Sequence, residues 1–203
     1  MINIPKISIS YDEVLMRLGY SKSRTKIDDR TQILIKENIS LSNKLINPKI
    51  VVAFDEISLQ NECVLFNKGY KISSFDIVKL LKDCFMGYGI AITIGEALES
   101  KRDDFLKQKE VFNALILDAA GSVGAENCIQ ALHEQIEKLE NDKGNAITRR
   151  YSCGYGDWRL KEQKDFLNWL GADAIGIKVN DSYMMKPEKS ISALLGVKRR
   201  KSE

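Results

Sequence analysis

The stretch Arg150-Tyr-Ser-Cys-Gly-Tyr-Gly-Asp157 separates a long helical part of the chain from a C-terminal part made of strand-like pieces and turns. It brings an arginine, two glycines and an aromatic ring together in an irregular segment directly before a helical pattern. A guanidinium can grip a planar carboxylate through two parallel charge-assisted hydrogen bonds, and glycines let backbone groups approach a ligand. The stretch therefore predicts a binding loop. The alternative is that the glycines only shape a turn and that Arg150 pairs with a surface acid.

The sequence on the C-terminal side of this loop predicts one helix and then strands. Asp157 is expected to cap that helix, and Gly171 to end it. One side of the helix is mostly apolar: Leu160, Gln163, Phe166, Leu167 and Leu170. Residues 175–197 mix strand-like pieces with turns.

On the N-terminal side, residues 105–141 form the longest helical pattern. From Phe105 onward, apolar residues recur at spacings of three, four and seven positions. Gly121, Gly124 and Ala125 lie in the middle of this pattern, where small residues cost helix propensity unless a backbone or a ligand approaches closely. Close packing is the simpler of these two explanations.

Shorter elements fill the first half of the chain and favour an α+β fold. Helices are expected after Ser10, after Asp28 or Asp29, and after Ser73, the last with Phe75, Val78, Leu81 and Phe85 on one face. Strands are expected at residues 50–54 and 90–94, and a hairpin or two short strands at 62–72. A break at 87–89 is expected to separate the helix after Ser73 from the strand at 90–94. Helices in blocks beside hairpin-like strands, without regular strand-helix alternation, predict a mixed or antiparallel sheet flanked by helices.

Composition sets limits on the class of protein. With 203 residues, 44% of them hydrophobic, the chain has enough apolar material for one compact core. We expect one domain over residues 1–197 and a basic tail over 198–203. The 31 Lys and Arg against 28 Asp and Glu give +3, without the excess positive charge of a dedicated nucleic-acid binder. The tail is therefore interpreted as solvated, the alternative being an anchor for an anionic surface.

Cysteine usage and hydropathy indicate a cytoplasmic protein. Cys63, Cys84, Cys128 and Cys153 are spaced too widely for a metal clamp or a dense disulfide framework, which points to a reducing compartment. Residues 1–10 lack the pattern of a secretory signal, and no run reaches about 18 apolar residues. We expect neither export nor membrane insertion.

The sequence shows none of the common catalytic motifs. His133 has no second histidine or suitably spaced cysteine, so it is interpreted as a helix-surface residue rather than a metal ligand. The pairs Gly121-x-x-Gly124 and Gly154-x-Gly156 do not match the dinucleotide-binding fingerprint. The chemistry is therefore expected to depend on binding and not on an acid-base site.

Two segments carry a resemblance to a known family. The loop resembles the R-x-x-x-G-Y motif for S-adenosylmethionine in the activation (reactivation) domain of cobalamin (vitamin B12)-dependent methionine synthase, and more closely that of its stand-alone relatives, which commonly have G-Y-G-D. Residues 176–192 look like the family's stretch after the helix that follows this motif, where Gly, Lys, Ser, Met, Pro and a Ser-x-Ser pair recur in that order. Leu18-Gly19-Tyr20, Thr93-Ile94-Gly95 and residues 119–126 are similar more weakly.

The resemblance implies a C-shaped α+β domain that binds S-adenosylmethionine in an extended pose. Arg150 would hold the methionyl carboxylate, and the backbone of Ser152, Cys153, Gly154 and Tyr155 would line the adenosyl part. The ring of Tyr155 would also suit a sulfonium cation. Residues 182–192, with Ser190 in the Ser-x-Ser pair, would complete the cleft wall or the rim that faces cobalamin.

Two departures from the family pattern bear on the site. Position 153 is Cys where the family usually has Pro, and a buried, inert thiol is the expected role. The acid that holds the ligand amine in the full-length enzymes has two candidates in family-like segments, Glu96 and Glu126, of which Glu126 is preferred.

The resemblance also implies which molecules take part. In the family, oxidised cobalamin receives an electron from a flavodoxin-type donor, and methyl transfer from S-adenosylmethionine then traps the reduced product. The expected role of this chain is therefore that of a methyltransferase component. The Asp-x-His-x-x-Gly signature of a cobalamin-binding protein is absent, so cobalamin is expected on a separate corrinoid methyltransferase, in a split methionine synthase. The alternative function is a non-catalytic S-adenosylmethionine sensor or assembly subunit.

Overall fold

The computed structural model describes residues 2–21 and 25–200. Its helices are α1 (Tyr11–Arg17), α2 (Asp29–Leu45), α3 (Phe75–Leu80), α4 (Ala97–Lys107), α5 (Val111–Asn141) and α6 (Gln163–Leu170), with short 3-10 helices at η1 (Leu160–Glu162) and η2 (Ala172–Ile175). Its strands are β1 (Lys49–Gln60), β2 (Cys63–Phe66), β3 (Lys71–Ser73), β4 (Met86–Thr93), β5 (Asn145–Ile147), β6 (Lys178–Val179), β7 (Met185–Lys186) and β8 (Ser190–Arg199).

A single antiparallel sheet organises the fold. Within the described ranges, six strands are ordered β3-β2-β1-β4-β8-β5, and every neighbouring pair is antiparallel. The last strand in the chain, β8, therefore lies between β4 and β5, and β6 and β7 form a separate hairpin. The expected α+β fold with helices flanking an antiparallel sheet is confirmed.

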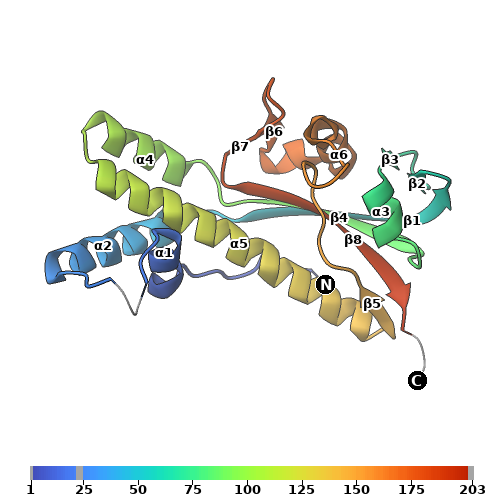
Figure 1. Cartoon of the computed structure of the whole chain (residues 1–203), viewed down its shortest axis with the longest axis horizontal. Coiled ribbons are helices and arrows are strands. Elements are labelled where there is room, and N and C mark those ends of the chain that lie inside the picture. Colours follow the sequence, from blue (N-terminus) through green and yellow to red (C-terminus); the bar gives the residue numbers. More distant parts are fainter. Residues whose placement is uncertain (1, 22–24, 201–203) are drawn as a thin grey trace.

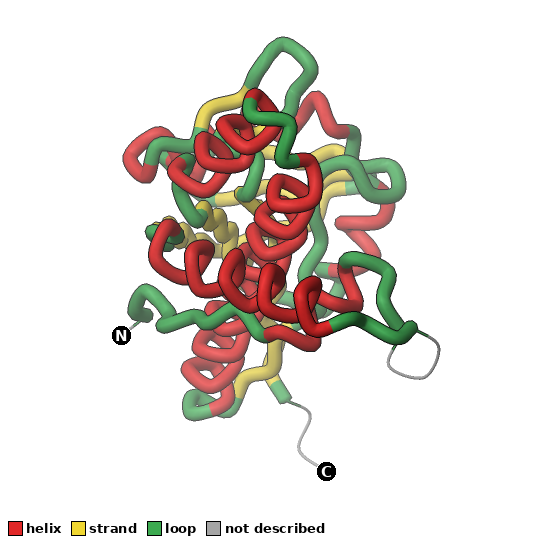
Figure 2. Tube along the Cα trace, turned by 90° about the vertical axis from the view of Figure 1, so that its left-hand side faces the viewer, coloured by secondary structure: helices red, strands yellow, loops and turns green. Residues whose placement is uncertain are grey.

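Helices cover both faces of the central strands. Figures 1 and 2 show α5 running along one face, with α1, α2 and α4 packed outside or beside it. Its buried side chains, among them Leu132 and Ile136, pack against Ile90, Ile92 and Leu195 of the sheet. On the other face, α3 and α6 build a second cluster around Trp158 and Phe166. Burial on both sides explains the nearly continuous apolar sequence of β4 and β8.

Local signals located several helix ends correctly. The Ser10 hydroxyl accepts from the Glu13 amide, and the Asp28 carboxylate accepts from the Thr31 amide, as the capping patterns predict. Gly171 ends α6 in the left-handed conformation. These contacts involve residues only a few positions apart, so sequence spacing was enough to find them.

Other boundaries differ from the sequence prediction. The expected break at residues 87–89 is wrong: Gly87 and Gly89 lie inside β4, since a Cβ at Gly89 would overlap Trp169 and Leu170. The first strand is longer than residues 50–54, because its second half pairs with β2 and keeps one face exposed. Phe105 belongs to α4, which a left-handed residue at Lys109 separates from α5.

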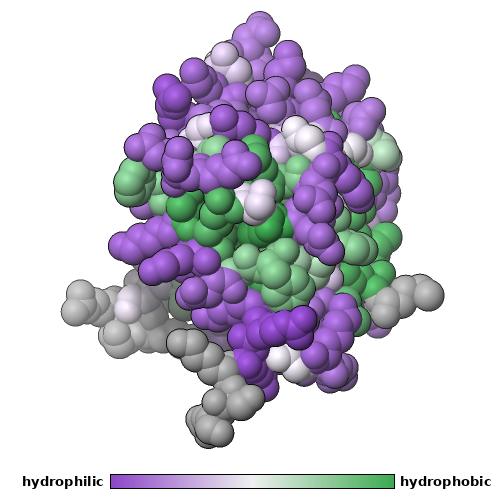
Figure 3. Space-filling model, turned by 90° about the vertical axis from the view of Figure 1, so that its right-hand side faces the viewer, coloured by the Kyte–Doolittle hydropathy of each residue, from purple (hydrophilic) through white to green (hydrophobic). Residues whose placement is uncertain are grey.

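The face predicted for α3 is right for Val78 and Leu81 and wrong for Phe75 and Phe85. The cap is Ser74, one residue later than expected, and the buried positions are Ile77 and Leu81. Phe75 is 67% exposed, and Phe85 lies beyond the helix and is 39% exposed. Figure 3 shows that hydrophobic side chains gather on the end of the molecule that carries α3.

The C-terminal residues of the described chain are part of the sheet. Lys198 and Arg199 lie in β8 and pair with β5. Residues 201–203 of the expected basic tail lie outside the described residues. The domain boundary at residue 197 stays a prediction.

Candidate ligand-binding site

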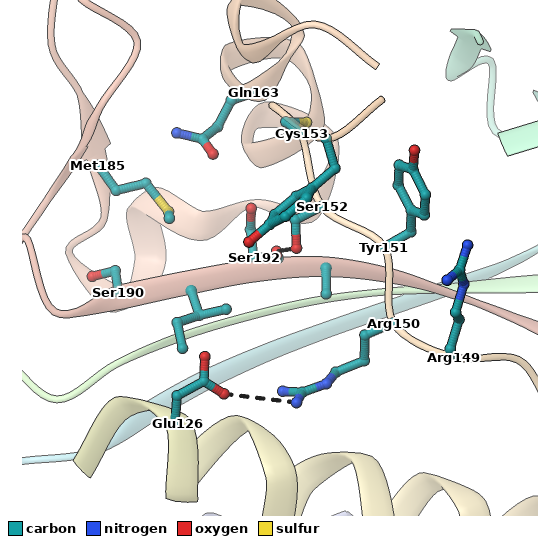
Figure 4. Close-up of a pocket in the computed structure, with 13 residues that line it drawn as sticks. Glu126, Arg149, Arg150, Tyr151, Ser152, Cys153, Gln163, Met185, Ser190 and Ser192 are labelled. Atoms are coloured by element: carbon teal, nitrogen blue, oxygen red, sulfur yellow. Dashed lines mark hydrogen bonds and ion pairs between the residues drawn. The ribbon is translucent and has the colours of Figure 1, made fainter. Parts of the chain in front are cut away.

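A cleft of about 630 Å³ opens between α5 and the loop before η1. Figure 4 shows Glu126 of α5 on one side, Ser152, Cys153 and Gln163 on the other, and the first part of β8 between them. Its lining residues are Glu126, Arg149, Arg150, Tyr151, Ser152, Cys153, Tyr155, Gln163, Met185, Ser190, Ile191, Ser192 and Ala193.

The loop that carries Arg150 is fastened to β8 by hydrogen bonds. The Tyr151 amide donates to the Leu194 carbonyl at 3.0 Å, and the Leu194 amide donates back at 2.7 Å. The Ser152 hydroxyl donates to the Ser192 carbonyl at 2.6 Å. These bonds hold an irregular segment next to the sheet in one conformation, so the side chains of the loop have fixed positions.

The same loop is tied to α3, which sequence reasoning did not predict. Asp157 does not cap the helix that follows it; its carboxylate accepts from the amides of Phe75 at 2.6 Å and Asp76 at 3.2 Å. The Tyr151 hydroxyl donates to Asp76 at 2.9 Å. Hydrogen bonds from Ser74 and from the α3 amides lower the pKa of Asp157. Asp157 therefore remains charged and links the loop to the N-terminus of α3.

Arg150 and Glu126 are oppositely charged residues that lie close together in the cleft, which Arg149 also lines. The Arg150 guanidinium lies 3.7 Å from the Glu126 carboxylate and 3.3 Å from the Gln130 side-chain oxygen. The Glu126 side chain is 59% exposed and that of Arg150 is 26% exposed. An ion pair this long and this exposed is weak, so both groups are available to a charged ligand.

The floor and far wall of the cleft add neutral polar groups. The Ser190 hydroxyl donates to the Pro187 carbonyl at 2.7 Å. Ser192 is 2% exposed, and its hydroxyl has no hydrogen-bond partner among the described residues. Buried hydroxyls are nearly always paired, so the Ser192 hydroxyl is a hydrogen-bonding group that a water or a ligand in the cleft can use.

Cys153 is buried in the cleft wall. Desolvation raises the pKa of its thiol to about 12, so the group is neutral at physiological pH. Tyr155, two residues later, is 68% exposed, and its ring lies edge-on to the Tyr151 ring with the centroids 6.4 Å apart. Gly154 between them is left-handed, and its amide donates to the Trp158 carbonyl at 2.7 Å.

The structure therefore brings most of the residues singled out in the sequence into one cleft. Arg150, Ser152, Cys153, Tyr155, Glu126 and Ser190 line it, whereas Gly154 shapes the loop. Glu96, the other acidic candidate, lies at the N-cap of α4 and is not among the lining residues. His133 is half-buried, and burial together with the charge of Arg150 lowers its pKa.

Several lining residues were not proposed as ligand contacts from the sequence. Gln163 had been assigned only to a helix side, and Tyr151 and Arg149 had no signal besides their place next to Arg150. Ser192 and Met185 lie in the family-like stretch, so their residue types carried a partial signal. Ile191 lies between Ser190 and Ser192 in the same stretch, and Ala193 is the next residue of β8 beyond it.

Charged residues of α4 and α5 fix the wall that carries Ser190. Arg102 contacts Glu188 at 2.8 Å and Asp118 at 3.1 Å. The Lys189 ammonium lies 2.8 Å from Asp118, and its aliphatic stem crosses α5 at Gly121, where a Cβ would come within 3.1 Å of it. Leu98 of α4 is nearer still, at 2.9 Å, so close packing explains the glycine in the middle of the helix, and one of the two packing partners directly precedes Ser190.

Two classes of site receive no support from the structure. Among the residues described, no group of three or more His, Cys, Asp or Glu is arranged to hold a metal ion. In the same part of the chain, none of the helices combines the length and the apolar character needed to span a bilayer.

Comparisons with known proteins agree on the family. The sequence gives no significant match among curated proteins. The structure is similar to the crystal structure of the MetH reactivation domain bound to AdoHcy, with a TM-score of 0.70 and 16% sequence identity over 93% of this chain and 74% of that one. At this identity the likeness shows a shared fold. Residues 59–202 match the family model described as vitamin B12 dependent methionine synthase, activation domain. The chain thus belongs to the family of activation domains of vitamin B12-dependent methionine synthase.

Proposed function

We propose that this protein binds S-adenosylmethionine in the cleft and supports reductive methylation of a cobalamin held by a separate corrinoid methyltransferase, as in a split methionine synthase. Membership in the activation-domain family supports a role associated with methyl transfer. The likeness to a domain that is bound to AdoHcy supports a ligand of the adenosyl class. A cytoplasmic location, which the cysteine spacing favours, is part of the proposal.

The observation that carries the proposal is the pair of opposite charges in the cleft. S-adenosylmethionine ends in an α-amino acid, whose carboxylate and ammonium are attached to the same carbon atom. Arg150 and Glu126, with their charged groups 3.7 Å apart, offer the complementary pair. In this proposal the guanidinium binds the carboxylate and Glu126 binds the ammonium, so the weak internal pair is exchanged for two ligand contacts.

The rest of the cleft suits the adenosyl part and the sulfonium. Ser152 and Cys153 and the backbone of residues 152–155 would line the sugar and the base, with Ser190 and the unpaired Ser192 hydroxyl on the floor. The exposed ring of Tyr155 would lie over the ligand, where its face stabilises a cation. These residues fit an extended ligand with polar groups at both ends.

The chemistry asked of this chain is positioning. Bound cobalamin supplies the cobalt that accepts the methyl group, and a flavodoxin-type or similar donor supplies the electron. This chain would hold the sulfonium so that its methyl group points out of the cleft toward the partner, and S-adenosylhomocysteine would be left behind. Proton transfer is not required, in keeping with a cleft whose thiol is neutral and buried.

Titration calorimetry with S-adenosylhomocysteine tests ligand binding directly, since this product lacks the reactive sulfonium. Arg150→Ala should weaken affinity about 10- to 150-fold, the effect of losing a charge-assisted contact of roughly 1.5–3 kcal/mol. Arg159→Ala is the matched control, because that arginine is exposed and pairs only loosely with Glu162 at 3.5 Å. Equal affinities of the two variants would remove Arg150 from the site.

Methyl transfer needs a second experiment. A purified corrinoid protein, a reductant and methyl-labelled S-adenosylmethionine are mixed with the wild-type chain, and labelled methylcobalamin is measured. Formation that depends on this chain and falls in Arg150→Ala supports the proposal. Binding without transfer to any corrinoid protein supplied would favour a sensor or an assembly subunit.

A further inference from the structure

Gln163 places a buried amide against the proposed adenosyl end of the cleft. It is the first residue of α6, is 5% exposed and lines the cleft next to Cys153. An amide offers a donor on one side and an acceptor on the other, so its orientation decides which chemistry the cleft presents.

A hydrogen bond outside the cleft fixes that orientation. The Gln163 Nε2 atom donates to the Tyr183 carbonyl at 2.7 Å. A flipped amide would set two acceptor oxygens against each other at that distance, so the nitrogen must face Tyr183. Figure 4 shows the result: the Gln163 oxygen points toward the middle of the cleft.

The Tyr183 carbonyl is itself held in place by a turn. The amides of Ser182 and Met184 donate to the Asn180 side-chain oxygen at 3.0 and 2.9 Å, and the Asn180 amide donates to the Met184 carbonyl at 3.0 Å. Tyr183 has a φ of 61°, an uncommon conformation for a residue with a side chain. This conformation belongs to the tight turn between β6 and β7, which fixes the direction of the Tyr183 carbonyl.

We propose that the Gln163 Oε1 atom recognises the 6-amino group of the adenine ring. The inference rests on the proposed function, because it assigns a specificity residue within that same cleft. The amino group carries two N–H donors, and Oε1 is an acceptor that cannot turn away. A base with a carbonyl at the same position, such as hypoxanthine, would set oxygen against oxygen and leave the buried amide unsatisfied. The Ser192 hydroxyl on the floor is a buried polar group without a hydrogen-bond partner among the described residues.

Calorimetry of the wild-type protein with three ligands tests the inference without any variant. The ligands are S-adenosylhomocysteine, its deaminated analogue S-inosylhomocysteine, and the N6,N6-dimethyl derivative of S-adenosylhomocysteine. The last two lack the 6-amino donors in different ways. We expect both to bind at least about tenfold more weakly than S-adenosylhomocysteine, the factor that corresponds to the loss of one buried hydrogen bond.

Variants then assign the discrimination to Gln163. Gln163→Leu removes the acceptor, so affinity for S-adenosylhomocysteine falls and the ratio between adenosyl and inosyl ligands approaches one. Met185→Leu is the matched control, since it changes another cleft-lining side chain without changing a hydrogen-bonding group. It should alter both affinities by the same factor and leave the ratio intact.

The outcomes separate this inference from the proposed function. If the wild-type protein binds S-adenosylhomocysteine but binds both modified ligands equally well, recognition by Gln163 is wrong and the proposed function stands. A ratio that survives in a folded Gln163→Leu variant also overturns it. If none of the three ligands binds, the proposed function fails, and the inference fails with it.

Discussion

Gly156 is the position where a single methyl group should do the most damage to the binding loop. Its φ is 52°, in the left-handed region, and a Cβ built there would overlap the Asp76 carboxylate and the Tyr151 hydroxyl. Those two groups are hydrogen-bonded to each other at 2.9 Å and tie the loop to α3. A Gly156→Ala substitution must therefore break that bond or move the loop.

The expected cost has two parts of known size. A side chain in the left-handed region costs roughly 1–2 kcal/mol. Losing the exposed hydrogen bond between Tyr151 and Asp76 costs about 0.5–1.5 kcal/mol more. We therefore expect Gly156→Ala to lower the free energy of unfolding by about 1.5–3.5 kcal/mol.

Gly171→Ala is a control that isolates the first part. Gly171 has a φ of 68° and nothing within 4 Å of the position of a Cβ, so the substitution pays for conformation alone. Denaturant unfolding of the two variants and of wild type gives the comparison, with S-adenosylhomocysteine affinity as a second measurement. Gly156→Ala should also weaken binding, because the loop carries Arg150. Equal destabilisation by both variants would refute the assigned overlap with Asp76 and Tyr151.

Three further predictions concern buried and charged groups. Glu140 is 0% exposed and accepts hydrogen bonds from Tyr88, Lys143 and Asn145. Glu140→Ala should therefore lower the free energy of unfolding, measured with denaturant, by about 3–5 kcal/mol, and a decrease under about 1 kcal/mol would contradict this network. Hydrogen bonds from Arg102 and then Lys186 lower the pKa of Glu188 to about 2, and in Arg102→Ala an NMR titration should show it rising toward its usual value near 4.5. Because the folded pKa is depressed, this carboxylate stabilises the fold above about pH 4.5, and the contribution is lost as the pH falls toward 2. Burial raises the pKa of Cys153 to about 12, so iodoacetamide at pH 8 should label the half-buried Cys63 well before Cys153. Mass spectrometry of peptides measures the order of labelling, and the reverse order would contradict the assigned burial.

Much of the local structure could be predicted from neighbouring residues. The caps at Ser10 and Asp28 and the left-handed Gly171 depend on contacts over three or four positions. The binding loop was also visible, since Arg150 and its glycines are contiguous in the chain. Each of these features is determined by short-range geometry, and sequence spacing records that geometry directly.

Long-range contacts changed the assignments that spacing alone had suggested. Asp157 has the residue type and place of a cap for the following helix, but its carboxylate binds the amides of α3, about eighty positions earlier. Gly87 and Gly89 suggested a break, and instead they make room in β4 for side chains of β2 and α6. Neither partner can be inferred from the residues nearby, because only the folded packing brings it close.

The sequence by itself determined the α+β class, the caps at Ser10, Asp28 and Gly171, and the family-like loop, because each depends on residue type and on neighbours along the chain. Only the tertiary structure decided that Glu126 faces Arg150 across a cleft, that Lys189 crosses α5 at Gly121, and that the Gln163 oxygen points inward. These arrangements depend on which distant surfaces meet, and burial and hydrogen bonding between those surfaces select one arrangement that no local pattern encodes.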